Sequence, residues 1–254
     1  MSLAAVNSPE ALLLALQSQK DRRLPLTLGR HANDNAGDVA VADELEHYWL
    51  VPGGIVELSS LPGAGAWSLA FTIAALARRR AIATNHPRWI GALDPWSTLS
   101  AMALAHLLHP VAGDDDPDAL RETLVVRPRE DALLRTATRI TRSGACTAVV
   151  VDAAGLDNVS SLILGLRRLA IAADETQAAV ILVTSESAHR SQPLPVAARA
   201  QVVPAADGAG TVVRPLRHRN GMPPRMTIPK GRLQRSVIEH LVAECRASAA
   251  AEPL

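Results

Sequence analysis

The segment IVELSSLPGAGAWSLA, residues 55–70, decides the fold of this chain. It opens with residues typical of a buried strand, continues through Gly63 and Gly65, which mark a turn, and ends in an apolar helical pattern. A strand, a glycine-containing turn and a helix in this order are the setting in which phosphate-binding loops occur. The segment therefore predicts a strand–loop–helix unit that can be compared with such a loop residue by residue.

The loop lacks most residues of a working phosphate-binding loop. In the pattern G-x-x-x-x-G-K-[ST], backbone amides hold the phosphates, the lysine reaches the β/γ oxygens and the hydroxyl binds magnesium. Gly65 takes the second glycine position, but Ser60, Ala66 and Trp67 replace the first glycine, the lysine and the hydroxyl residue. Ser68 offers a hydroxyl one position later, without a lysine in either register. The missing lysine removes a charge-assisted contact of roughly 1.5–3 kcal/mol. A retained turn without its chemistry is the favoured interpretation, and weak residual nucleotide binding is the alternative.

Around this unit, short β-branched runs alternate with helical patterns. Strands are expected at residues 55–58, 123–126, 147–151 and 180–184, and helices at 68–79, 130–142 and 158–173. A further strand is expected at either 81–84 or 89–92. This alternation predicts βαβ units and an α/β fold, with a mostly parallel central sheet and helices on both faces.

The two ends of the chain depart from this alternation. Short strands at 200–203, 211–216 and 226–228 are separated by turn residues, which predicts antiparallel edge strands near the C-terminus. A closing helix is expected at 233–246, an N-terminal helix at 8–19 and a loop at 31–37. We therefore expect an N-terminal helical arm and linker over 1–49, a core domain over 50–246 and a tail over 247–254.

Composition excludes several classes of protein. Apolar residues make up 48% and charged residues 20% of the 254 residues, which is typical of a soluble globular protein. No apolar run reaches the roughly 18 residues of a membrane span, and the N-terminus has an acidic residue, Glu10, where a secretory signal is basic. Cys146 and Cys245 are far apart and fit reduced thiols. We expect a cytoplasmic protein.

Positive charge is concentrated near the C-terminus. The chain has 26 basic and 25 acidic side chains, yet residues 211–254 hold eight basic and three acidic ones. Seven cations follow one another without an intervening acid and form what we call the basic strip: Arg214, Arg217, Arg219, Arg225, Lys230, Arg232 and Arg235. Such a strip can bind the phosphates of DNA or an acidic protein partner. The alternative is a solvated hairpin whose arginines meet acids nearby. The aromatic platforms common in single-strand binding are missing near it.

Four stretches, taken in order, resemble the RecA family of recombinase ATPases over residues 50–235. The first is Gly54–Leu58, the strand before the loop, and the second is Ala92–Pro95, which matches an A-L-D-P motif. The third, residues 134–152, matches a helix, an R-S-G-A link and a Walker B strand. The fourth, residues 211–224, matches a late hairpin. No single match is specific, but their order and spacing together are. The resemblance implies a RecA-like core.

The chain departs from the family at its catalytic positions. The resemblance implies that Asp152 matches the Walker B aspartate, which holds magnesium through water; an N-cap for the following segment is an equally supported alternative. Ile90 and Gly91 occupy the neighbourhood of the family's catalytic glutamate, so no carboxylate is expected to activate water there. The resemblance then implies a pseudo-ATPase, with no catalytic residue, no cofactor and no metal.

Among RecA-like proteins, the chain resembles in size and plan the ImuA group, accessory proteins of bacterial mutagenic translesion-synthesis cassettes that are sometimes grouped with SulA-type division inhibitors. This resemblance implies a role in DNA-damage tolerance within the SOS response, beside a pseudo-polymerase and an error-prone polymerase. It also implies self-association through the N-terminal arm, while direct DNA contact stays open. The alternatives are a weakly active nucleotide-dependent RecA-type ATPase and a SulA-type inhibitor of cell division.

Two further groups of residues carry expectations. Trp49, Trp67, Trp89 and Trp96 are expected around the remnant loop, with Trp67 filling the place of a phosphate; base stacking is the less favoured alternative. His106 and His109 have a spacing that suits a metal, but no third ligand follows at a suitable distance, so no metal site is expected.

Overall fold

The computed structural model describes residues 35–61, 63–100, 103–104, 108, 120–156, 159–185, 194–208 and 210–229. Nearly all of them belong to one compact unit, residues 37–254. The expected helices at 8–19 and 233–246 and the expected tail at 247–254 lie outside the described residues.

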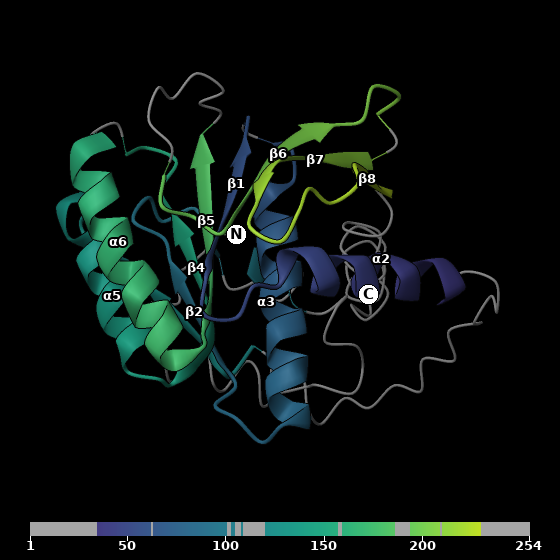
Figure 1. Ribbon diagram of the computed structural model, residues 1–254. Coiled ribbons are helices and arrows are strands. Elements are labelled where there is room, and N and C mark those ends of the chain that lie inside the picture. Colours follow the sequence, from purple (N-terminus) through teal and green to yellow (C-terminus); the bar gives the residue numbers. More distant parts are fainter. Residues whose placement is uncertain are drawn as a thin grey trace, which may run out of the picture. The chain divides into compact units, whose positions relative to one another are not determined.

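Eight strands form a single sheet in the order β3-β2-β4-β5-β1-β6-β7-β8 (Figure 1). Their bounds are β1 Ile55–Ser60, β2 Trp89–Leu93, β3 Thr123–Val126, β4 Cys146–Asp152, β5 Ala179–Ser185, β6 Ala198–Pro204, β7 Gly210–His218 and β8 Met226–Pro229. The six strands from β3 to β6 in this order pair in parallel, whereas β7 and β8 pair antiparallel. The expectation of a mostly parallel sheet with antiparallel edge strands near the C-terminus is confirmed.

Helices cover both faces of the sheet, as the strand–helix alternation predicts (Figure 1). The described helices are α2 Asn35–Trp49, α3 Ala66–Ala83, the 3₁₀ turn η1 Glu130–Ala132, α5 Leu133–Arg142 and α6 Val159–Thr176. α3 packs on one face, against β4 and β5, and α5 packs on the other face together with α6. None of the described helices is long and apolar enough to span a membrane.

The alternation of side chains along the strands divides the core into two layers. On β1, Ile55 faces the α5–α6 side, whereas Val56 and Leu58 face the α3 side. The layer on the α3 side also contains Leu45 and Trp49 of α2, and we call it the first core cluster. Because β1, β4 and β5 are covered on both faces, they carry the nearly continuous apolar runs visible in the sequence.

Two expectations need correction or completion. The strand left open between 81–84 and 89–92 is β2, and Ala81–Ala83 instead forms the last turn of α3. Residues 35–37, expected in a loop, begin α2, which the sequence pattern did not predict.

The short pairing between β7 and β8 has a simple chemical cause. β8 pairs with β7 only from Gly210 to Val213. Continued in the same register, the ladder would place Pro215 opposite Pro224, and neither residue has an N–H to donate. The second half of β7 is therefore paired only with β6 within the described part of the chain.

Candidate functional site

The loop between β1 and α3 keeps the backbone shape of a glycine turn. Gly63 and Gly65 have φ values of +79° and +91°, which residues with a side chain rarely adopt. Gly65 is the N-cap of α3, and its carbonyl accepts the N–H of Leu69 at 3.0 Å. The loop therefore delivers the chain to the N-terminus of a helix, the position where backbone amides can meet an anion.

Thr211, at the start of β7, holds this loop from the side. Its Oγ1 donates a hydrogen bond to the carbonyl oxygen of Ala64 at 3.3 Å. A Cβ added at Gly65 would lie only 2.9 Å from the same Oγ1. Sequence reasoning missed Thr211, because 147 residues separate it from Ala64 and no local pattern marks the contact.

The first turn of α3 presents apolar groups. Ala66 is buried at the lysine position. Trp67 is half-buried, packs against the first core cluster and stacks on Phe71, with ring centroids 5.8 Å apart. The indole thus lies along its own helix. That it fills the place of a phosphate stays a prediction, and its partial burial makes it a weaker wedge than a fully buried indole.

Asp94 follows β2 and is fully occupied by local hydrogen bonds. Its Oδ1 accepts the backbone N–H and the hydroxyl of Thr98, each at 2.9 Å, and its Oδ2 accepts the N–H of Leu99 at 2.9 Å. The Nε of Arg127 lies 3.8 Å from Oδ2. The carboxylate is completely buried and fixes the turn after β2.

Asp152 ends β4 at the same carboxyl edge of the sheet. It is 2% exposed, and its Oδ1 accepts the N–H of Ala154 at 3.1 Å. Burial raises the pKa of this carboxyl group, the Ala154 hydrogen bond opposes the rise and the nearby Asp94 adds to it. The hydrogen bond caps the turn that follows β4, whereas α6 begins only at Val159, so this side chain is a turn cap and not the N-cap of that helix.

Asp152→Asn should raise the melting temperature at pH 7. A pKa above the ordinary value means that the folded state disfavours the ionised carboxyl, so this group stabilises the fold at low pH and loses that contribution as the pH rises. Asparagine keeps an oxygen for the Ala154 N–H without the charge. The melting temperatures of the two proteins should therefore differ at pH 7 and converge as the pH is lowered towards the ordinary aspartate pKa of about 3.9. The exposed Asp131→Asn is the matched control. A lower melting temperature for Asp152→Asn at pH 7 would contradict this account.

A buried charged cluster lies on the strand that leads to the loop. Glu57 of β1 is completely buried; Thr184 of β5 donates its hydroxyl to Oε1 at 3.0 Å, and the Nε of Arg199 on β6 lies 3.2 Å from Oε2. The cluster ties together three adjacent strands, and such a pair is costly to break from one side. The sequence shows Glu57 within an apolar strand, a signal that could have identified a paired buried acid.

The four tryptophans do not gather around the loop, and this expectation is wrong. Trp49 lies edge-to-face with His218, with ring centroids 6.2 Å apart, and Trp89 begins β2 at the amino edge of the sheet. Trp67 and Trp96 lie at the carboxyl edge, where the indole of Trp96 packs over Gly155. Trp89 is the first residue of β2, whereas the loop follows the last residue of β1. Because the two strands run in the same direction, Trp89 and the loop lie at opposite edges of the sheet.

The structure describes four members of the basic strip, Arg214, Arg217, Arg219 and Arg225, and all four are exposed; we call them the arginine surface. Lys230, Arg232 and Arg235 lie outside the described residues. β7 starts beside the loop at Thr211 and runs to the amino edge, so Arg217 lies about 20 Å further along the strand. Arg217 and Arg219 are therefore remote from the loop, whereas Arg214 lies only about 10 Å from Thr211 along β7.

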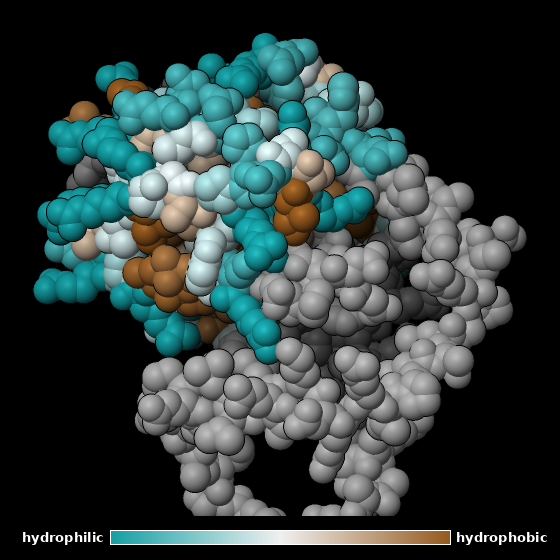
Figure 2. Space-filling model, turned by 90° about the horizontal axis from the view of Figure 1, so that it is seen from below, coloured by the Kyte–Doolittle hydropathy of each residue, from teal (hydrophilic) through white to brown (hydrophobic). Residues whose placement is uncertain are grey.

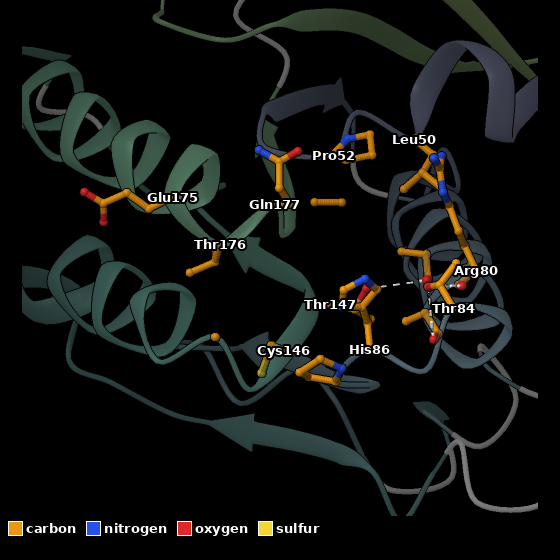
Figure 3. Close-up of a pocket in the computed structure, with 15 residues that line it drawn as sticks. Leu50, Pro52, Arg80, Thr84, His86, Cys146, Thr147, Glu175, Thr176 and Gln177 are labelled. Carbon is orange, nitrogen blue, oxygen red and sulfur yellow. Dashed lines mark hydrogen bonds between the residues drawn. The ribbon is translucent and has the colours of Figure 1, made fainter.

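A pocket of about 390 Å³ opens at the amino edge of the sheet (Figure 3). Among its lining residues are Arg80 in the last turn of α3, His86 between α3 and β2, Glu175 in the last turn of α6, Gln177 just after α6, and Cys146 of β4. Burial raises the pKa of the Cys146 thiol to about 11, so the thiol is protonated at neutral pH. Seen from this side, the described surface is mostly hydrophilic with a smaller hydrophobic area (Figure 2). This mixture of charges, hydroxyls and apolar groups selects no single class of ligand.

Comparison with known proteins places the fold. A scan against protein-family models and a search of curated proteins find no match for the chain. Among solved structures, the chain is similar to one described as the crystal structure of the RadB recombinase, with a TM-score of 0.58 and 15% sequence identity. The match covers 74% of this chain and 91% of that chain. The chain thus has a RecA-like α/β fold, as the motifs predict.

Proposed function

We propose that this protein is a non-catalytic RecA-like accessory protein in DNA-damage tolerance, acting in the cytoplasm within mutagenic translesion synthesis. The observation that carries the proposal is the loop at residues 61–65. Its glycine turn and helix N-terminus are kept, while the lysine and hydroxyl positions hold Ala66 and Trp67. A RecA-like fold that keeps the shape of its loop and lacks the charged groups suits an interaction protein better than a motor.

Electrostatics support the absence of turnover. Phosphoryl transfer depends on cations that neutralise the transferred group in its transition state. Residues 60–68 include no lysine or arginine. The carboxyl edge instead presents Asp94, already bound to local donors, and Asp152, whose Oδ1 accepts the N–H of Ala154. Ile90 and Gly91 are buried inside β2 and supply no general base.

The arginine surface supports a role in binding partners, because exposed guanidinium groups recruit anionic macromolecules at little cost to the fold. By resemblance, the partners would be a pseudo-polymerase and an error-prone polymerase of a mutagenesis cassette. The N-terminal arm would serve self-association.

The purified protein should hydrolyse no ATP above background, with or without single-stranded DNA. Phosphate release with magnesium-ATP tests this, and isothermal titration tests nucleotide binding in the same buffer. DNA-stimulated turnover that Asp152→Ala abolishes would contradict the proposal and establish the alternative, a weakly active RecA-type ATPase. The observation that favours this alternative is the left-handed backbone at Gly63 and Gly65, because it keeps the loop shape in which backbone amides can bind a phosphate.

A cellular test separates the proposed role from the fold alone. Deletion of the gene should lower damage-induced mutagenesis, and the Asp152→Ala variant should restore it fully. Restoration by wild type but not by this variant would indicate that the nucleotide site is used.

A further inference from the structure

We propose that the arginine surface docks an acidic protein segment that carries apolar side chains. This inference rests on the proposed function, because it names the chemistry of the partner that such an accessory protein would bind. It follows from three properties of β7 and the turn after it: charge, exposed apolar groups and a fixed backbone.

The charge of the arginine surface is uncompensated within the described structure. Residues 211–229 contain no acidic residue. None of the four arginines forms an ion pair with any residue of the described ranges, although other arginines of the same sheet do, such as Arg199 with Glu57. An anionic partner is what these four guanidinium groups can bind without breaking an existing contact.

Two large apolar side chains stand among these arginines. Leu216 on β7 is 46% exposed, and Met222 in the following turn is 58% exposed. Leu216 is the extra residue of a β-bulge, because Arg199 and Ala200 of β6 pair with Arg217 and Pro215. It directly precedes the exposed Arg217. Arginine and methionine are enriched in protein–protein interfaces.

The turn that carries Arg219 is held in place from both sides. Its N–H donates to the carbonyl oxygen of Ala197 at 2.9 Å. The Nδ1 of His218 accepts the N–H of Asn220 at 3.1 Å, and its Nε2 lies 2.8 Å from the carbonyl oxygen of Tyr48 at the end of α2. These two contacts fit the tautomer with its proton on Nε2. A fixed turn loses little conformational entropy on binding, which favours docking of an extended segment.

The same observations favour protein over nucleic acid. Single-stranded DNA is bound by basic grooves combined with aromatic side chains on which bases stack. Between residues 210 and 229 there is no Trp, Tyr or Phe, and Trp49, next to His218, is completely buried. Leu216 and Met222 offer apolar contact that phosphates cannot use, whereas an acidic segment with leucines can pair with the arginines and cover both.

Fluorescence anisotropy of the full chain with three labelled probes tests the proposal. The probes are a peptide with two glutamates for each leucine, the same peptide with serine in place of leucine, and oligo(dT). We expect the leucine peptide to bind more tightly than the serine peptide. The double variant Leu216→Ser with Met222→Ser should lower the affinity for the leucine peptide by about threefold to tenfold. Its affinity for the serine peptide should stay unchanged.

Charge variants complete the test. Replacing Arg217, Arg219 and Arg225 by alanine should lower the affinity for both peptides by about tenfold or more. The control variant, Arg135→Ala with Arg139→Ala, removes two exposed arginines of α5 and should change neither affinity. If oligo(dT) binds more tightly than the leucine peptide, with an affinity that the Leu216 and Met222 substitutions do not change, the proposal is overturned in favour of nucleic acid. Equal binding of the two peptides, or no binding of either, would overturn it as well. These outcomes are independent of ATP turnover, so failure here is distinguishable from failure of the proposed function.

Discussion

Arg78→Ala should lower the free energy of unfolding by about 3–5 kcal/mol. Arg78 lies on α3 and is 1% exposed; its Nη1 donates to the carbonyl oxygen of Arg88 at 2.7 Å and pairs with Glu122, just before β3. Among the described residues, the alanine variant leaves the mostly buried Glu122 with Arg88 as its remaining cation, whose Nη2 lies 2.9 Å from Oε1. Urea denaturation followed by far-UV circular dichroism measures the difference.

The adjacent residue provides a matched control. Arg79 is exposed on the same helix, so Arg79→Ala should change the free energy of unfolding by less than about 0.5 kcal/mol. Equal losses for the two variants would show that helix propensity, and not the buried ion pair, sets the cost.

The second large effect is expected at Trp49. Trp49→Ala should cost about 3–5 kcal/mol, because the indole is completely buried in the first core cluster and its removal leaves a cavity between α2 and β7. Trp89→Ala, at a tryptophan that is 43% exposed, should cost much less. Melting curves of both variants check the ranking.

A more conservative variant separates volume from hydrogen bonding at this site. The indole Nε1 of Trp49 has no hydrogen-bond partner among the described residues. Trp49→Phe removes this unsatisfied donor together with some volume, so its cost should be well below that of alanine. A loss equal to that of Trp49→Ala would indicate that the indole nitrogen has a partner after all.

Strands that are buried on both faces could be predicted closely from the sequence. The expected strand at residues 147–151 lies within β4 and the one at 180–184 lies within β5, because apolar runs of this kind have few other stable arrangements. The glycine turn at 63–65 was equally visible, since its conformation requires these residues.

What could not be predicted depends on contacts between distant residues. Asp43, Glu44 and Glu46 interrupt the apolar pattern of α2, so its position is set by Leu45 and Trp49 packing into the core. In the same way, the pairing of Arg199 with Glu57 and the hydrogen bond of Thr211 to Ala64 exist only once β6 and β7 have joined the sheet.

The central place of β1 has a consequence during synthesis on the ribosome. Within the described part of the chain, β1 pairs only with β5 and β6, and the nearer of these begins about 120 residues after β1 ends. At about 5–20 residues per second, this apolar strand waits roughly 6–24 seconds for its first neighbour. Over that time its unpaired edges are open to other nascent chains, so production of this protein should depend on chaperones that shield strands more than its final stability alone would suggest.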